Sequence, residues 1–166
     1  MPTSAQGSRL VIRPMERDDL AAIHNINTDC LTISLRDHYS KEQLKAWMKD
    51  QTLEGYWNRH EAGEDFLVAA RNGLVVGYCS WQGAQLTALF VSPHIQRKGI
   101  GSALVKACET RAKQKITWLK ALLGASDFYE AFGFVIDREG HDVKRGVKIP
   151  HVVMRREGKS ASDDGE

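Results

Sequence analysis

The residues from Leu89 to Ser102 constrain the fold of this chain more than any other segment. An apolar, β-prone run ends at Ser92-Pro93, and a loop with cationic residues and two glycines, Gly99 and Gly101, follows it. A helical pattern then begins, with apolar residues three and four positions apart at Ile100, Ala103, Leu104, Ala107, Cys108 and Ala112. The pattern predicts a strand, a glycine loop and a helix that begins at the glycines.

This glycine loop has the chemistry of an anion-binding site. The first N–H groups of a helix have no partner within the helix. Gly99 and Gly101 carry no Cβ atom that would keep a bulky anion away from those groups, and Arg97 and Lys98 add positive charge. A solvated turn that needs glycine only for its backbone angles is the alternative for the glycines alone. The strand, the cations and the helix together favour a pyrophosphate site.

Two common phosphate-binding motifs are excluded by the residues after the glycines. A Walker loop needs Lys and then Ser or Thr, but Ser102 and Ala103 follow Gly101. A dinucleotide-binding fingerprint needs a third glycine where this chain has Leu104. We therefore expect another phosphate-bearing ligand.

The loop resembles a signature of the GCN5-related N-acetyltransferases, the GNAT superfamily. The first matching motif is Gln96-Arg97-Lys98-Gly99-Ile100-Gly101, which fits Gln/Arg-x-x-Gly-x-Gly/Ala. The second is Phe128-Tyr129-Glu130-Ala131-Phe132-Gly133-Phe134, which fits Phe-Tyr-x-x-x-Gly-Phe. The motifs stand in the expected order and close to the expected separation, and the resemblance covers residues 9–155.

The resemblance implies an α/β fold (α+β by some schemes), with a mixed, mostly antiparallel sheet that is splayed between its fourth and fifth strands and has flanking helices. It implies acetyl-CoA as cosubstrate, with no metal. The pantetheine arm would lie against Leu89, Phe90 and Val91, and the pyrophosphate would lie on the loop formed by Gln96, Arg97, Lys98, Gly99, Ile100, Gly101 and Ser102. The acetyl group would move directly to a primary amine of a small molecule or a peptide.

Tyr129 matches the family position of the general acid that protonates the departing thiolate. The alternative role is an aromatic core residue beside Phe128 and Phe132. Residues 122–127 are about two residues shorter than in the family pattern, which bears on where Tyr129 lies relative to the sulfur.

The general base cannot be assigned from the sequence. An alkyl amine has a pKa of about 10 and must lose a proton before it attacks. Many relatives carry a glutamate on the strand before the loop, but the corresponding strand here, residues 85–91, has no carboxylate. The nearest alternatives by topology are Glu64, Asp65, Asp37 and His38, and we expect each to be a surface residue. Thr87 could hold a water molecule but is a poor base.

The composition is that of one soluble domain. The 166 residues are 42% hydrophobic and 27% charged, with a net charge of +2, which gives no reason to expect a nucleic-acid or membrane partner. We expect a flexible N-terminus (residues 1–8), a single domain (residues 9–156) and a disordered polar tail (residues 157–166). The three cysteines are widely spaced and residues 1–8 lack a signal sequence, so we expect a cytoplasmic protein.

The local patterns predict the remaining elements. Asn72-Gly73 predicts a tight hairpin between strands at residues 66–70 and 74–81. Residues 25–38 and 51–65 are interpreted as irregular connections. The expected strands are at residues 9–14, 85–91, 117–122, 134–136 and 149–155, and the expected helices begin near residues 19, 41, 100 and 126.

Two further readings stay open at this stage. A non-catalytic module that binds acyl-CoA would explain the missing strand carboxylate and the short segment before Phe128. Acetylation of a nucleic-acid-linked amine is disfavoured by the modest charge. Relatives are often dimers, and the apolar content neither supports nor excludes a homodimer.

Overall fold

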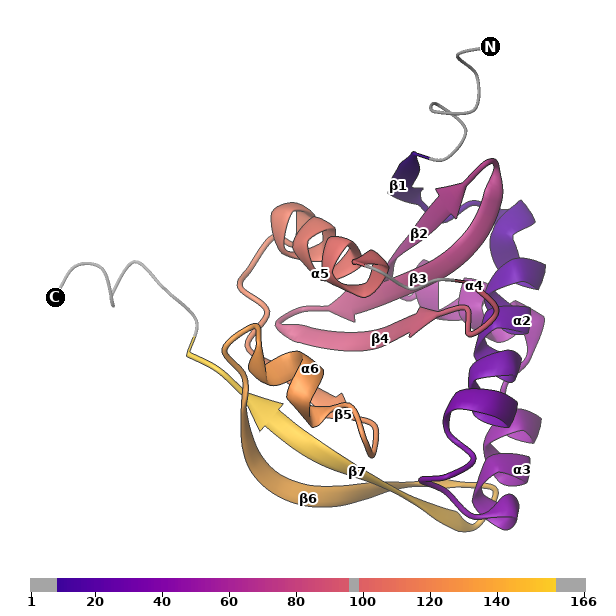
Figure 1. Cartoon of the computed structure of the whole chain (residues 1–166), viewed down its shortest axis with the longest axis vertical. Coiled ribbons are helices and arrows are strands. Elements are labelled where there is room, and N and C mark those ends of the chain that lie inside the picture. Colours follow the sequence, from indigo (N-terminus) through magenta and orange to yellow (C-terminus); the bar gives the residue numbers. More distant parts are fainter. Residues whose placement is uncertain (1–8, 96–98, 158–166) are drawn as a thin grey trace, which may run out of the picture.

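The computed structural model describes residues 9–95 and 99–157, in which seven strands form one sheet (Figure 1). The strands are β1 (Leu10–Pro14), β2 (Asp65–Arg71), β3 (Leu74–Gln82), β4 (Gln85–Val91), β5 (Trp118–Ala121), β6 (Val135–Lys144) and β7 (Val147–Arg155). The α-helices are α2 (Leu20–Asp29), α3 (Lys41–Asp50), α4 (Leu53–Glu61), α5 (Ile100–Arg111) and α6 (Ser126–Glu130). A 3₁₀ turn, η1 (Arg17–Asp19), precedes α2, and a π-helical turn, η2 (Cys30–Ser34), follows it.

The sheet is splayed where its fourth and fifth strands meet, which confirms the predicted fold. The strand order is β1-β2-β3-β4-β5-β7-β6, and every neighbouring pair is antiparallel except β4 and β5. That parallel pair joins only Gln85 with Trp118 and Leu86 with Leu119. Within the described residues, β4 has no strand partner on this side from Thr87 onward. Its backbone groups there are available to a ligand, except for the Val91 carbonyl, which accepts a hydrogen bond from the Cys30 thiol.

A β-bulge sets the direction of the side chains at the splay. Ser80 of β3 pairs with Ala88, whereas the next residue, Trp81, pairs with Leu86. Thr87 is therefore the extra residue on β4, and a bulge of this kind turns a side chain away from the regular alternation. It brings the Thr87 hydroxyl to the Ser80 hydroxyl, 2.7 Å away.

Helices cover both faces of the sheet, because successive side chains of a strand point to opposite faces and apolar side chains lie on both. On one face, Cys79 packs with Ile100 and Leu104 of α5. On the other face, Tyr78 packs with Ile23 of α2 and Tyr56 of α4. All three cysteines are buried.

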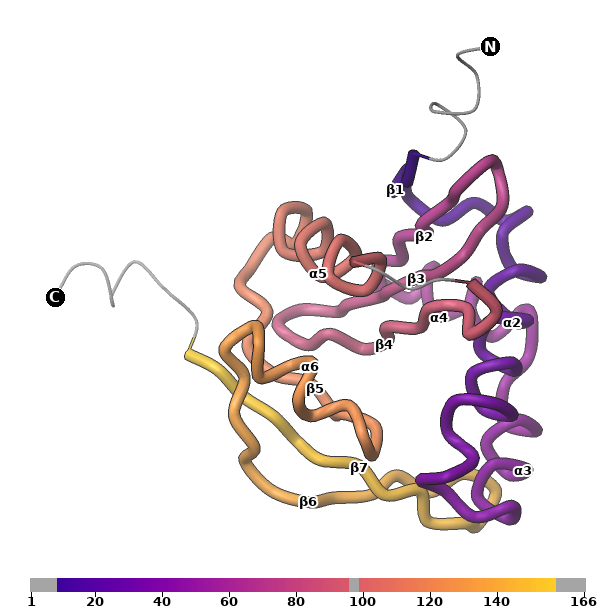
Figure 2. The backbone as a smooth tube through the Cα atoms, viewed as in Figure 1, coloured from indigo at the N-terminus to yellow at the C-terminus, as the bar shows by residue number. Residues whose placement is uncertain are grey.

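The hairpin of β6 and β7 packs against α3 (Figure 2). Gln43 of α3 donates a hydrogen bond from Nε2 to the Lys148 carbonyl, 3.1 Å away, and Lys144 pairs with Asp50 at 3.5 Å. Within the described residues, no helix is both long and apolar enough to span a membrane.

Two predicted connections and the predicted end of one strand differ from the structure. Of residues 25–38, interpreted as irregular, residues 25–29 continue α2 and residues 30–34 form η2, whereas residues 35–38 form turns. Residues 51–65 contain α4. Thr52 caps the N-terminus of this helix by accepting a hydrogen bond from the Gly55 N–H. The strand predicted at 134–136 extends to Lys144, because Arg145 and Gly146 turn the chain with positive φ angles into β7.

Candidate active site

The first of two cavities, here named the α5 cavity, lies at the splayed end of β4. It has a volume of about 500 Å³ and is lined by Leu89, Phe90 and Val91 of β4, by Gly99, Gly101 and Ser102 at the start of α5, and by residues 122–125 and Tyr129. Six residues predicted to bind the cofactor thus border one cavity, and Ile100 adjoins two of them in the chain. The predicted contacts of Gln96, Arg97 and Lys98 lie outside the described residues.

The two loop glycines differ in the space around them. Gly99 caps α5 with a φ of +72°, and nothing lies within 4 Å of the place where its Cβ would be, so a side chain there would project into open space beside the cavity. A Cβ on Gly101 would instead lie 3.4 Å from the Phe128 ring. Ile100, between the two glycines, is fully buried in the core.

The second cavity, named the α4 cavity, lies between the α3–α4 helices and strands β4 to β6. It has a volume of about 450 Å³, and its wall includes Arg59 of α4, Tyr78 of β3, Thr87 of β4 and Asn27 of α2. Five residues line both cavities: Leu89, Phe90, Leu122, Ala125 and Tyr129. The two cavities therefore meet at the splay, with Tyr129 at their junction.

Tyr129 is the one tyrosine shared by the two cavities. Its ring packs edge-on against Phe128 and Phe134, with ring centroids 5.1 and 6.2 Å away. Burial raises the pKa of its hydroxyl, so the phenol stays protonated through the neutral range. Within residues 9–95 and 99–157 this hydroxyl has no hydrogen-bond partner. It is a proton donor without a protein acceptor.

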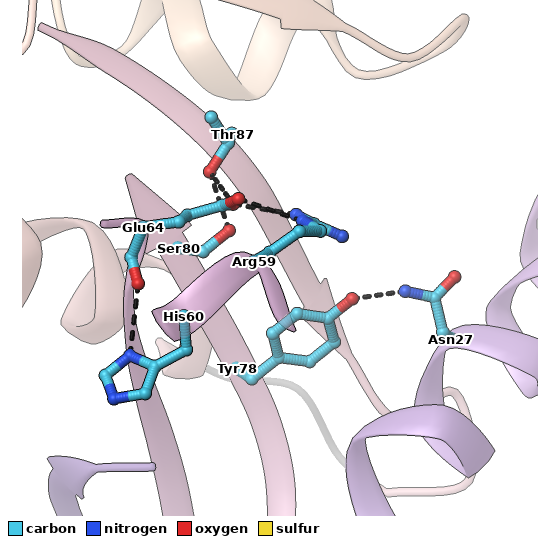
Figure 3. Close-up of polar contacts among 7 residues, drawn as sticks. All are labelled: Asn27, Arg59, His60, Glu64, Tyr78, Ser80 and Thr87. Atoms are coloured by element: carbon cyan, nitrogen blue, oxygen red, sulfur yellow. Dashed lines mark hydrogen bonds and ion pairs between the residues drawn. The ribbon is translucent and has the colours of Figure 1, made fainter. Parts of the chain in front are cut away.

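Glu64 is buried beside the α4 cavity, contrary to the expectation of a surface residue (Figure 3). Arg59 donates to both of its carboxylate oxygens, from Nε at 2.9 Å and from Nη2 at 2.7 Å. The Thr87 hydroxyl donates to the same carboxylate at 2.5 Å. Burial alone would raise the pKa of Glu64, but these hydrogen bonds and the Arg59 charge hold it below its usual 4.5.

The other candidate bases do not share this position. Asp65 and Asp37 are exposed, as expected. His38 is also exposed, but its ring packs on Gly124 at the wall of the α5 cavity. Tyr39, next to His38, accepts a hydrogen bond from the Leu123 N–H and donates one to the Pro150 carbonyl, and so fixes the segment between β5 and α6.

Asn27 and Tyr78 contribute unpaired polar groups to the α4 cavity. The Asn27 amide nitrogen donates a short hydrogen bond to the Tyr78 hydroxyl, and the Asn27 carbonyl oxygen Oδ1 is buried without a partner (Figure 3). Neither residue was predicted from the sequence, and Arg59 was not predicted either. A signal existed for Asn27, because it follows Leu20 and Ile23 on the apolar stripe of α2 where an apolar residue is expected.

Two of the buried thiols, those of Cys79 and Cys108, are poorly suited to act as nucleophiles. Burial raises the pKa of the Cys108 thiol to about 12 and raises that of Cys79 as well, which disfavours the reactive thiolate. No group of three or more His, Cys, Asp or Glu side chains in residues 9–95 and 99–157 is arranged to hold a metal ion.

The site described above can now be compared with known protein families. Residues 35–157 match the model of the acetyltransferase (GNAT) domain family, which is most of the chain. The chain belongs to this family and is an acetyltransferase, as the two sequence motifs indicated.

Individual relatives agree with the family assignment. An uncharacterized N-acetyltransferase of Escherichia coli (strain K12), YafP, is 28% identical over 148 residues, which are 89% of this chain and 96% of YafP. A GCN5-related N-acetyltransferase from Rhodopseudomonas palustris has a similar fold, with a TM-score of 0.79, 24% identity and coverage of 90% and 96% of the two chains. PaiA N-acetyltransferase from Thermoplasma acidophilum, solved in complex with coenzyme A, has a TM-score of 0.73, 21% identity and coverage of 90% and 99%.

Proposed function

We propose that this protein transfers an acetyl group from acetyl-CoA directly to a primary amine of a small molecule or a peptide. The observation that carries the proposal is the meeting of two cavities at Tyr129. One cavity has the features of a CoA site, and the other has a polar wall suited to an amine acceptor. Their junction brings a thioester and an amine to the same place.

The α5 cavity suits acetyl-CoA in two respects. The unpaired edge of β4, including Leu89, Phe90 and Val91, offers main-chain groups to the amide-bearing pantetheine arm, as an added strand would use them. The N-terminus of α5 offers the N–H groups of Gly101 and Ser102 to the pyrophosphate, and Gly99 leaves open space there. Acetyl-CoA would supply an activated acyl group with a thiolate as leaving group.

Tyr129 would donate its proton to the departing thiolate, so that CoA leaves as a thiol. The proton that the attacking free amine loses on becoming an amide would restore the phenol. Its hydroxyl is protonated, lacks a partner in the described structure and borders both cavities. General acids of this kind typically contribute about 10²–10⁴ to a rate. Because Cys79 and Cys108 are buried and burial raises the pKa of their thiols, neither is suited to form an acyl-cysteine intermediate.

Glu64 is better suited to holding Arg59 than to accepting the proton of the amine. Its lowered pKa makes it a weak base, and protonation would break its paired hydrogen bonds with Arg59. We therefore assign it a positioning role.

The test is thiol release from acetyl-CoA in the presence of primary amines, with the acetylated product identified by mass spectrometry. Amine-dependent release with formation of an N-acetyl product is the expected result. Tight acetyl-CoA binding with no release above background for any amine would contradict transfer and favour the non-catalytic module.

A further inference from the structure

The wall of the α4 cavity between Arg59 and Asn27 has polar groups that the protein itself leaves unpaired. Buried polar groups are usually paired, and an unpaired one costs about 1–3 kcal/mol. Asn27 is 1% exposed and borders the cavity, and its Oδ1 has no partner among the residues that the structure describes. Rotating the amide by half a turn would only leave its nitrogen unpaired instead. An unpaired group of this kind at a cavity wall indicates that a ligand supplies the missing hydrogen-bond partner.

Arg59 presents a second unpaired group to the same cavity. Its Nε and Nη2 are bonded to Glu64, so its Nη1 remains, and within the described residues Nη1 has no hydrogen-bond partner. The Arg59 side chain is 44% exposed, whereas that of Glu64 is 7% exposed. The carboxylate is thus buried behind the guanidinium and fixes its plane, and the open end of the guanidinium is available to a ligand.

Tyr78 lies between these two groups. In Figure 3 the free end of Arg59 lies on the side of the Tyr78 hydroxyl, and Asn27 approaches that hydroxyl from the other side. Because Tyr78 accepts its hydrogen bond from Asn27, its own O–H hydrogen is free to be donated. Burial raises the pKa of this hydroxyl, so the hydrogen is retained. The Tyr78 ring also stacks on Phe90, which borders both cavities.

We propose that Arg59, Tyr78 and Asn27 bind the acceptor, and that the acceptor is an amine with a carboxylate close to it, as in a free amino acid. The N–H groups of Arg59 Nη1 and the O–H of Tyr78 donate to the carboxylate. Asn27 Oδ1 accepts a hydrogen bond from the amine, on the side of the cavity that Phe90 borders. This inference rests on the proposed acetyl transfer and names its substrate class.

The experiment compares the standard L-amino acids with their carboxamides and with the amines that remain after decarboxylation, using thiol release from acetyl-CoA. Rates are expressed per free amine, because the three forms have different amine pKa values. For the preferred amino acid, kcat/KM should exceed that of its carboxamide and of its decarboxylated amine about tenfold or more. This is the effect expected when charge-assisted hydrogen bonds to the carboxylate are lost.

A double variant, Arg59→Gln with Glu64→Gln, removes the buried pair without leaving a lone charge. It should lose the preference for the carboxylate while its KM for acetyl-CoA stays near that of the wild type. Tyr78→Phe should weaken the same preference. The matched control is Arg17→Gln with Glu54→Gln, an exposed Arg–Glu pair that does not line the cavity, and it should retain the preference.

The outcomes separate this inference from the proposed function. Acetylation of the neutral amines as efficiently as the amino acids, or a preference that survives in the double variant, overturns the carboxylate site and leaves acetyl transfer standing. Thiol release with no member of any of the three sets, by a protein that binds acetyl-CoA, overturns both.

Discussion

The ring of His38 occupies the space that a side chain on Gly124 would need. A Cβ on Gly124 would lie 2.6 Å from His38 Nε2, a separation that Cβ atoms essentially never show. Gly124 also has a φ of +89°, in the left-handed region that favours glycine. The contact brings the loop before α3 against the segment between β5 and α6, at the wall of the α5 cavity.

This contact predicts that Gly124→Ala destabilises the protein more than the same change at another left-handed glycine. Gly73 has a φ of +76° with nothing within 4 Å of its Cβ position, so Gly73→Ala measures the backbone cost alone, about 1–2 kcal/mol. Urea denaturation should give a clearly larger loss for Gly124→Ala, and adding His38→Ala should reduce that loss. Equal losses at both glycines would show that the His38 contact carries no energy.

Replacing Tyr129 with Phe should lower kcat about a hundredfold or more, because the variant lacks the hydroxyl that we propose as proton donor to the thiolate. The dissociation constant for acetyl-CoA should change little, since the ring and its packing against Phe128 and Phe134 remain. Steady-state kinetics and calorimetry check the two parts. An unchanged kcat would remove Tyr129 from the mechanism.

The stability that Glu64 contributes should depend on pH. Its pKa is lower in the folded protein than its usual 4.5, so the unfolded chain takes up a proton more readily. The contribution is therefore fully present above about pH 4.5 and is lost as the pH falls through the folded pKa. Glu64→Gln should lower the free energy of unfolding most near neutral pH, and the difference from wild type should shrink in acid.

The control for this pH dependence is Glu61→Gln, a change at an exposed glutamate of α4. Chemical denaturation at a series of pH values should show a nearly constant difference between this variant and the wild type. A Glu64→Gln difference that is equally constant would contradict the assignment of a buried, ionised carboxylate to Glu64.

The sequence was sufficient for the elements whose patterns are local. Asn72-Gly73 forms the predicted hairpin, with positive φ angles at both residues, and α5 begins at Ile100 next to the predicted glycine cap. α4 was missed because Tyr56 is its one buried residue, which leaves no apolar stripe to recognise. The length of β6 was missed because its residues are mostly exposed.

The candidate site was predictable only in part, for a physical reason. The motif proposed to bind CoA and the motif that contains Tyr129 are contiguous signatures, whereas the wall of the α4 cavity is assembled from α2, α4, β3 and β4. The burial of Glu64 depends on Arg59 and on the bulge that directs Thr87 toward it, and neither is visible as a pattern in one sequence. A lone glutamate is rarely buried, so the surface was the reasonable expectation.

The most direct test of the account is acetyl-CoA binding by calorimetry, comparing wild type with Gly99→Glu. Gly73→Glu is the matched control, because both glycines have left-handed φ angles and open space at the Cβ position. We predict that the wild type and Gly73→Glu bind acetyl-CoA, and that Gly99→Glu, folded by circular dichroism, does not. A folded wild type that binds no acetyl-CoA, or a Gly99→Glu variant that binds it as tightly as wild type, would contradict the placement of the cofactor at the start of α5.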